Sequence, residues 1–224
     1  MFDRLISLVG KDNFDKISNT KILLIGLGGV GGYSFESLVR SGINNITIAD
    51  YDKIDITNLN RQIITNSNNI GELKTSVALK RAKDINPNIN IHLINEFIDE
   101  NTINIININE FDYIIDACDS INTKSLLINK AFENNVKIIS SMGMANRMDP
   151  TKIKITTLNK TTYDPLAKKL RKLVDKEIQK KTIVITSEEE ALKREVLASN
   201  SFVPSTAGLM ITSYIINDII KEVR

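Results

Sequence analysis

From residue 21 onward, short hydrophobic runs alternate with longer amphipathic stretches. The runs are rich in isoleucine and other β-branched residues, which is typical of buried strands. The stretches between them carry apolar residues at helical spacing. Regular alternation of this kind predicts a parallel sheet with helices on both faces. We therefore expect an α/β fold with a doubly wound, Rossmann-like and mostly parallel sheet.

The pattern places the individual elements along the chain. We expect strands at residues 21–25, 46–50, 89–94, 113–117 and 137–140, and helices at 4–17, 29–41, 71–86, 99–108 and 122–134. After residue 149 we expect a strand at 152–157, a basic helix at 165–180, a strand at 182–186, an acidic stretch at 188–190 and a final apolar helix. We divide the chain into an N-terminal docking helix (1–20), a core (21–148) and a C-terminal extension of the same unit (149–224).

Composition narrows the class of protein. Of the 224 residues, 42% are hydrophobic and 25% are charged, as in an ordinary globular protein. A net charge of +2 is too small for a general nucleic-acid binder, so any such role needs a local basic patch. The single cysteine, Cys118, excludes an internal disulfide and agrees with a reducing cytoplasm. The longest apolar stretch, residues 207–220, is interrupted by polar residues, and we expect no membrane span.

A glycine-rich turn directly follows the first expected strand. Gly26, Gly28 and Gly31 have the spacing G-x-G-x-x-G, with Gly29 between them. Glycine permits the tight turn there and lets phosphates approach the amides at the start of the next helix. Asp50 ends the second strand, where a carboxylate can accept hydrogen bonds from ribose hydroxyls. These features predict a bound adenosine nucleotide, and they suit NAD and ATP equally.

Two cations distinguish ATP from a redox dinucleotide. Arg61 lies in a polar string after Asp50, and Lys74 lies in the first turns of the next expected helix. Both can point back over phosphates held by the glycine turn, and adenylate transfer to a carboxylate needs cations and Mg²⁺ there. Asp119, just past the fourth strand, is placed to hold that metal. Taken singly, the alternatives are a solvated Lys74, a salt-bridged Arg61 and a helix-capping Asp119.

These residues resemble the adenylating superfamily that includes ubiquitin-activating enzymes and bacterial activators of sulfur-carrier proteins. The matched residues are the glycine turn, Asp50, Asp52, Asn58, Arg61, Gln62, Lys74 and Asp119. The resemblance implies an ATP site in which Asp50 binds ribose, Asn58 and Arg61 contact the phosphates, and Lys74 neutralises the triphosphate. It implies that Asp119 holds Mg²⁺. Arg4 resembles the family's arginine that reaches into the partner subunit's site, which implies a homodimer.

Segments outside this core are most similar to the tRNA threonylcarbamoyladenosine dehydratases, at residues 142–145, 149–153, 164–171 and 201–208. That similarity implies an enzyme that adenylates the threonyl carboxylate of threonylcarbamoyladenosine in tRNA and closes a ring with loss of water. A monovalent cation is a further candidate cofactor, and a sulfur-relay or cysteine desulfurase protein is a further candidate partner.

The cysteine bears on the choice within the superfamily. An activator of a ubiquitin-like protein needs a thiol to take the acyl group, and Cys118 is the one candidate, better interpreted as a small buried residue. The ureido group of the same modified base can attack instead, with proximity supplying the rate. An activator of a small sulfur-carrier protein stays as the alternative function.

Basic residues gather on the expected helix at 165–180. Its cations include Lys168, Lys169, Arg171 and Lys172, which can follow a tRNA backbone. Acidic neighbours dilute the patch, and from charge alone a solvated helix face explains it equally well. The resemblance favours contact with tRNA.

Overall fold

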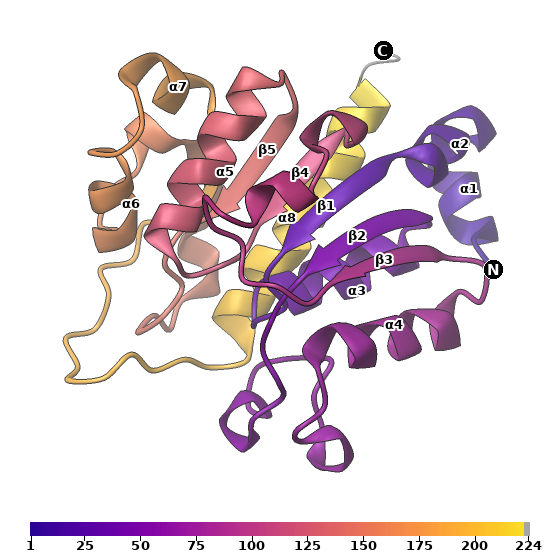
Figure 1. Ribbon diagram of the computed structural model, residues 1–224, viewed down its shortest axis with the longest axis horizontal. Helices are drawn as coiled ribbons and strands as arrows, with labels where there is room; N and C mark the ends of the chain where they lie inside the picture. Colours follow the sequence, from indigo (N-terminus) through magenta and orange to yellow (C-terminus); the bar gives the residue numbers. More distant parts are fainter. Residues whose placement is uncertain (222–224) are drawn as a thin grey trace.

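A computed structural model describes residues 1–221 as one seven-stranded sheet flanked by helices (Figure 1). The strands are β1 (Lys21–Ile25), β2 (Asn45–Ala49), β3 (Asn90–Ile94), β4 (Tyr113–Asp116), β5 (Lys137–Ser141), β6 (Ile153–Thr157) and β7 (Ile183–Ser187). The helices are α1 (Asp3–Val9), α2 (Lys11–Asn19), α3 (Gly31–Arg40), α4 (Lys74–Ile85), α5 (Ile121–Glu133), α6 (Pro165–Leu170), α7 (Lys176–Lys181) and α8 (Phe202–Lys221). The expected α/β fold is confirmed.

The strand order β3-β2-β1-β4-β5-β7-β6 explains where a ligand can bind. From β1 the chain moves outward to β2 and β3, and then returns to the other side of β1 with β4. Open sheets bind ligands at such a reversal, beyond the carboxyl ends of the strands. Every neighbouring pair is parallel except β6 and β7, which are antiparallel.

Alternate residues of β1 face the two layers of helices. Ile22 and Leu24 pack with the apolar faces of α3 and α8, whereas Leu23 and Ile25 pack with α5. All four are buried, as expected for a central parallel strand covered on both sides. Figure 1 shows α5 in front of the sheet and α8 behind it.

Helix α8 approaches α3 very closely. A Cβ atom at Gly208 would lie 2.4 Å from the carbonyl oxygen of Val30, so only glycine fits. The Ser34 hydroxyl donates to the Gly208 carbonyl at 3.0 Å, and the Thr212 hydroxyl donates to the Ser34 carbonyl at 3.1 Å. These contacts place the start of α8 beside the glycine-rich turn that precedes α3.

One expected helix is absent from its place. Residues 99–108 do not form an α-helix; they contain a 3₁₀ turn at Ile103–Ile105 and lead into another at Ile108–Glu110. The Asp99 carboxylate accepts from the Asn101 amide at 2.8 Å, and the Thr102 hydroxyl donates to the Phe97 carbonyl at 2.6 Å. Local side-chain bonds of this kind compete with helical hydrogen bonds.

Two other expected helices are each divided. The expected helix at 4–17 is broken at Gly10, whose φ of 84° separates α1 from α2. The expected helix at 165–180 stops at Leu170, and a new N-cap at Asp175, which accepts from the Glu177 amide, starts α7. After β7, residues 188–201 run as irregular coil until α8 begins.

Candidate functional site

A cavity of about 710 Å³ lies at the carboxyl ends of the parallel strands. Its wall includes these residues expected from the sequence: Gly26, Gly28, Gly29, Asp50, Asp52, Asn58, Arg61, Gln62, Lys74, Asp119 and Lys169. They come from the ends of β1, β2 and β4, from the loop after β2, from the start of α4 and from α6. The parallel sheet brings them together because its carboxyl ends share one edge.

The glycine-rich turn forms one wall. Gly26 has a φ of 92°, and a Cβ atom there would lie 2.8 Å from the carbonyl oxygen of Ala117. A Cβ atom at Gly31 would lie 1.8 Å from the Gly26 carbonyl oxygen, so Gly31 closes the turn behind the cavity. No atom lies within 4 Å of the Cβ position of Gly28. The backbone is therefore open to a phosphate at Gly28, next to the start of α3.

Two carboxylates and a lysine lie together just after β2. Asp50 accepts from the amide of Leu27 at 2.6 Å and from the amide of Asp52 at 2.8 Å. Burial raises the pKa of Asp50, against the opposing effects of Lys74 and the two amides. The Lys74 ammonium lies 2.6 Å from Asp52 and 4.0 Å from Asp50. Only 5% of Lys74 is exposed, so it is not a solvated helix charge.

The loop after β2 supplies the second cation. Arg61 donates to the Thr57 carbonyl at 2.7 Å and to the Asn60 side-chain oxygen at 2.9 Å. Both acceptors are neutral, and Arg61 makes no ion pair within residues 1–221. Asn58 is held in place because its side-chain oxygen accepts from the Asp55 amide at 3.1 Å.

Gln62 carries an unmatched acceptor in this wall. The residue is 5% exposed, and its Oε1 atom is buried without a hydrogen-bond partner in the described part of the chain. A buried polar atom without a partner is costly, and a ligand group that donates a hydrogen bond would relieve that cost. The opening at Gly28 and the polar side chains of this wall fit a polar ligand.

Asp119 is exposed at the rim of the same cavity. It does not cap α5, because the N-cap is Ser120, whose hydroxyl accepts from the Thr123 amide. Across residues 1–221, no cluster of three or more His, Cys, Asp or Glu side chains could hold a metal by itself. A Mg²⁺ ion at Asp119 would therefore take its other ligands from phosphate oxygens and water, as Mg²⁺ sites with nucleotides usually do.

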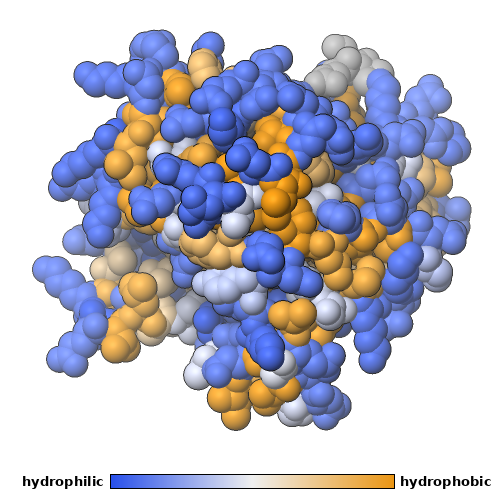
Figure 2. Space-filling view, in the orientation of Figure 1, coloured by the Kyte–Doolittle hydropathy of each residue, from blue (hydrophilic) through white to orange (hydrophobic). Residues whose placement is uncertain are grey.

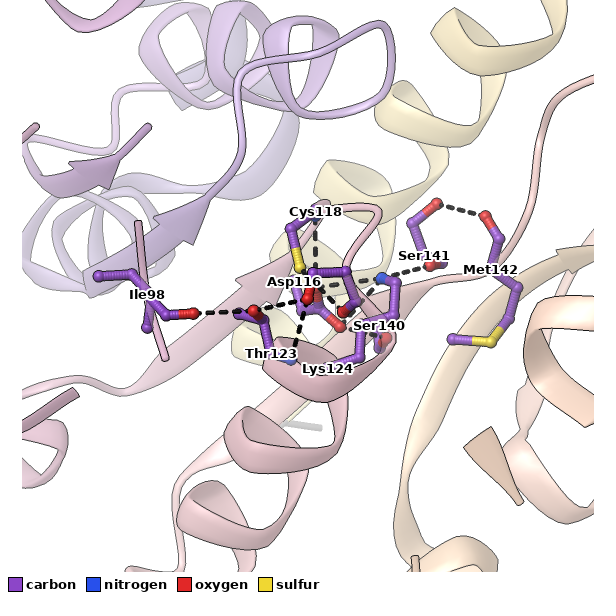
Figure 3. Close-up of polar contacts among 9 residues, drawn as sticks. Ile98, Asp116, Cys118, Thr123, Lys124, Ser140, Ser141 and Met142 are labelled. Atoms are coloured by element: carbon purple, nitrogen blue, oxygen red, sulfur yellow. Dashed lines mark hydrogen bonds and ion pairs between the residues drawn. The ribbon is translucent and has the colours of Figure 1, made fainter. Parts of the chain in front are cut away.

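Beneath the cavity lies a buried polar network that we did not predict (Figure 3). The Lys124 ammonium contacts both carboxylate oxygens of Asp116 at 3.1 Å and the carbonyl of Ser141 at 2.7 Å. The Ser140 hydroxyl donates to Asp116 at 2.5 Å. The sequence contained one signal for this network: Lys124 lies on the same helix face as the apolar residues Leu127 and Ile128, which are buried with it.

Cys118 belongs to this network. Its sulfur lies 3.1 Å from a carboxylate oxygen of Asp116. Burial, and then the negative charge of Asp116, raises the pKa of the Cys118 thiol far above neutrality. The thiol is therefore protonated at physiological pH and is a poor nucleophile.

The wall opposite the glycine turn consists of the segment after β5 and the coil at 188–201. Asn146, with a φ of 58°, donates its amide to the Ala198 carbonyl at 2.8 Å and accepts from the Ala198 amide at 2.7 Å. The Asn60 side chain donates to the Ser199 carbonyl at 3.1 Å. The coil thus spans from one wall to the other, and its exposed apolar side chains colour the lower left of Figure 2. The sequence did not predict these bonds, because they join residues that are distant along the chain.

The cations predicted to contact tRNA lie in three different environments. Lys169 lines the cavity, whereas Lys168 and Lys172 are exposed outside it. Arg171 is half-buried and bonds to the carbonyl and hydroxyl of Thr161. Arg4 is exposed on α1 and does not line the cavity of its own chain.

Comparison with known proteins identifies relatives over nearly the whole chain. Residues 2–221 match the ThiF family. A tRNA threonylcarbamoyladenosine dehydratase of Bacillus subtilis (strain 168) is 35% identical, over 100% of this chain and 96% of its own length. The E. coli dehydratase TcdA in complex with AMP superposes with a TM-score of 0.93 at 28% identity, covering 99% of this chain and 94% of that one. The same enzyme in complex with ATP gives 0.91 at 29%, with the same coverage.

Within residues 1–221, no helix is both long enough and apolar enough to cross a bilayer.

Proposed function

Because the chain belongs to the ThiF family, we propose that it is an ATP-dependent tRNA threonylcarbamoyladenosine dehydratase. The observation that carries this proposal is the agreement in sequence and fold, over almost the full chain, with proteins of that name. The cavity supports it because the glycine turn and Asp50, which suit a nucleotide, line one side. The segment after β5 and the coil at 188–201 line the other side, where the modified base of the tRNA can lie.

ATP fits the residues of the first wall. We propose that the ribose hydroxyls bond to Asp50 and that the phosphates lie over Gly28 and Gly29. Arg61, which has no carboxylate partner among residues 1–221, supplies a positive charge for the phosphates. Asn58, Asp52 and Gln62 complete this wall.

The reaction then consists of two displacements. A threonyl carboxylate oxygen attacks the α-phosphorus, the bond to the bridging oxygen breaks, and pyrophosphate leaves. The ureido group of the same base attacks the acyl carbon, loses a proton and releases AMP, so that the nucleoside loses one water overall. Arg61 and Lys74 stabilise the charge that develops on the phosphates. Mg²⁺ held by Asp119 would add to this stabilisation.

We further propose that Arg4 completes the site of a second subunit in a homodimer, since it lies outside the cavity of its own chain. Lys169 is the basic residue placed to meet tRNA at the cavity mouth, and Lys168 and Lys172 extend that contact on the surface. Arg171 supports this region from within through Thr161. The monovalent cation and the sulfur-relay or cysteine desulfurase partner stay predictions, with no residue assigned to them.

The proposal is tested by incubating the protein with ATP, Mg²⁺ and tRNA that carries threonylcarbamoyladenosine. We expect release of AMP and pyrophosphate, and a nucleoside lighter by one water on mass spectrometry. Lys74→Ala should abolish the mass change, and tRNA without the modification should release no AMP. An unchanged nucleoside mass while ATP binds would reject the dehydratase function, and ATP–pyrophosphate exchange with a small carrier protein would then support the alternative.

A further inference from the structure

We propose that Lys124 is a positioning residue, which holds the loop after β4 and the loop after β5 at the spacing that adenylation requires. The effect of Lys124 on the dehydration rate rests on the proposed function, whereas its effect on the positions of the two loops does not.

Lys124 is enclosed completely by the protein. It lies in the first turn of α5 and has 0% of its surface exposed. Its ammonium has three protons, and three oxygen atoms receive them: two of Asp116 and the carbonyl oxygen of Ser141. No donor is left for a ligand, so Lys124 cannot act by touching the substrate.

The Asp116 carboxylate holds the loop after β4. Asp116 is the last residue of that strand, and its carboxylate also accepts from the Cys118 amide at 3.3 Å and from the Ser140 hydroxyl at 2.5 Å. The next residue after Cys118 is Asp119, at the cavity rim. The path of the chain into Asp119 therefore depends on where this carboxylate lies.

The Ser141 carbonyl holds the loop after β5. Ser141 ends that strand, and the chain continues directly into residues 142–147, which line the cavity. Figure 3 shows Lys124 between Asp116 and Ser141, so that one ammonium group bridges the ends of two neighbouring strands. Both loops belong to the same cavity.

The stability of the fold does not by itself explain this arrangement. Two charges with 0% exposure lose their hydration, and apolar residues of similar volume often stabilise a core as well as a buried ion pair does. What apolar residues cannot provide is a directed bond to the Ser141 carbonyl. The function left for the pair is geometric, since a displacement of about 1 Å in an active site can cost about a hundredfold in rate.

Lys124→Met alone would leave the Asp116 charge buried and unpaired, and the variant can fail to fold. The main variant is therefore Asp116→Asn with Lys124→Met, which removes both charges at similar volume. We expect it to stay folded and to keep its ATP affinity, with a melting temperature only a few degrees lower because the Ser141 carbonyl loses its bond, while the dehydration rate falls roughly 10- to 100-fold. Amide hydrogen exchange in residues 142–146 should become faster because the Ser141 carbonyl is released.

Two further variants separate positioning from folding. Lys124→Arg keeps the charge but presents a planar fork, so its rate should lie between those of the wild type and the double variant. Glu36→Gln with Arg81→Met removes an ion pair that joins α3 to α4 outside the cavity wall, and it should leave the rate unchanged. This matched control measures the general effect of losing a partly buried pair.

Wild-type rates and wild-type exchange in both the double variant and Lys124→Arg would overturn the proposal. A loss of rate or of exchange protection in a folded variant would support it. If the wild type itself leaves the nucleoside mass unchanged, the proposed function fails, and hydrogen exchange still decides whether Lys124 holds the two loops.

Discussion

Lys74 and Arg61, two of the cations that line the cavity, differ in their electrostatic surroundings. Lys74 is buried and already paired with Asp52, so its position is set before any nucleotide arrives. Arg61 bonds only to neutral oxygens, which leaves its charge available at the cavity wall. An anion entering the cavity meets one preorganised ammonium and one uncompensated guanidinium, and preorganised charges stabilise a transition state most effectively.

At the same scale, Cys118 distinguishes between two chemical routes: transfer of the acyl group to a thiol, and direct attack by the ureido group. Burial and the neighbouring Asp116 raise the pKa of its thiol, so the thiol does not serve as an acyl acceptor at neutral pH. We expect Cys118→Ser to retain the wild-type dehydration rate, because serine can keep the bond to Asp116. The wild-type thiol should also react slowly with iodoacetamide at pH 7, as followed by mass spectrometry. Loss of turnover in this variant, with unchanged ATP binding, would instead indicate transfer through the thiol.

At the scale of elements, a charged cluster joins α3 to α4. The Glu36 carboxylate of α3 accepts from Arg81 of α4 at 2.6 Å and from Arg40 at 2.8 Å. Burial opposes ionisation of Glu36, but these hydrogen bonds outweigh it, and the pKa of Glu36 lies below its usual 4.5. The cluster therefore fixes the packing of α3 against α4 outside the cavity wall.

The lowered pKa predicts how stability depends on pH. The unfolded chain binds a proton at Glu36 more readily than the folded chain, so the stabilisation is complete above 4.5 and is lost as the pH falls through the lower folded pKa. Glu36→Gln should lower the free energy of unfolding at pH 7 by about 1 kcal/mol, a modest value because Arg81 is partly exposed. Urea denaturation at several pH values measures this difference. A difference that persists in acid would contradict the assignment.

At the scale of the whole molecule, Figure 1 shows α1 and α2 beside the amino end of β1, whereas the cavity is lined by residues at the carboxyl ends of the parallel strands. Arg4 on α1 is exposed there. A residue so placed can serve a nucleotide site only in another subunit, and twofold symmetry would give each of two sites an Arg4 from its partner.

Mixing two inactive variants tests this arrangement. Arg4→Ala and Lys74→Ala should each abolish dehydration alone. In a mixed dimer, one of the two sites regains both residues, so random mixing should restore about one quarter of the wild-type activity. Co-expression with two different tags isolates the mixed dimer for assay. Absence of recovery in an isolated mixed dimer would show that Arg4 does not act in trans.

Much of the sheet could be predicted from local pattern. The five core strands were placed to within a residue or two, because runs such as 22–25 are apolar at every position where both faces of the strand are buried. The helix expected at 99–108 was wrong because Asp99 and Thr102 bond to nearby backbone instead. Apolar periodicity contains no information about such side-chain competition.

The sequence by itself determined the fold class, the glycine turn and the cations at the strand ends, since spacing and residue type are local properties. Only the tertiary structure decided that β7 lies between β5 and β6, that the coil at 188–201 bonds to Asn146, and that Lys124 bridges Asp116 and Ser141. These arrangements join residues distant in sequence, whose contacts depend on how the chain packs. The cavity wall opposite the nucleotide turn and the buried network beneath the cavity were therefore visible only in three dimensions.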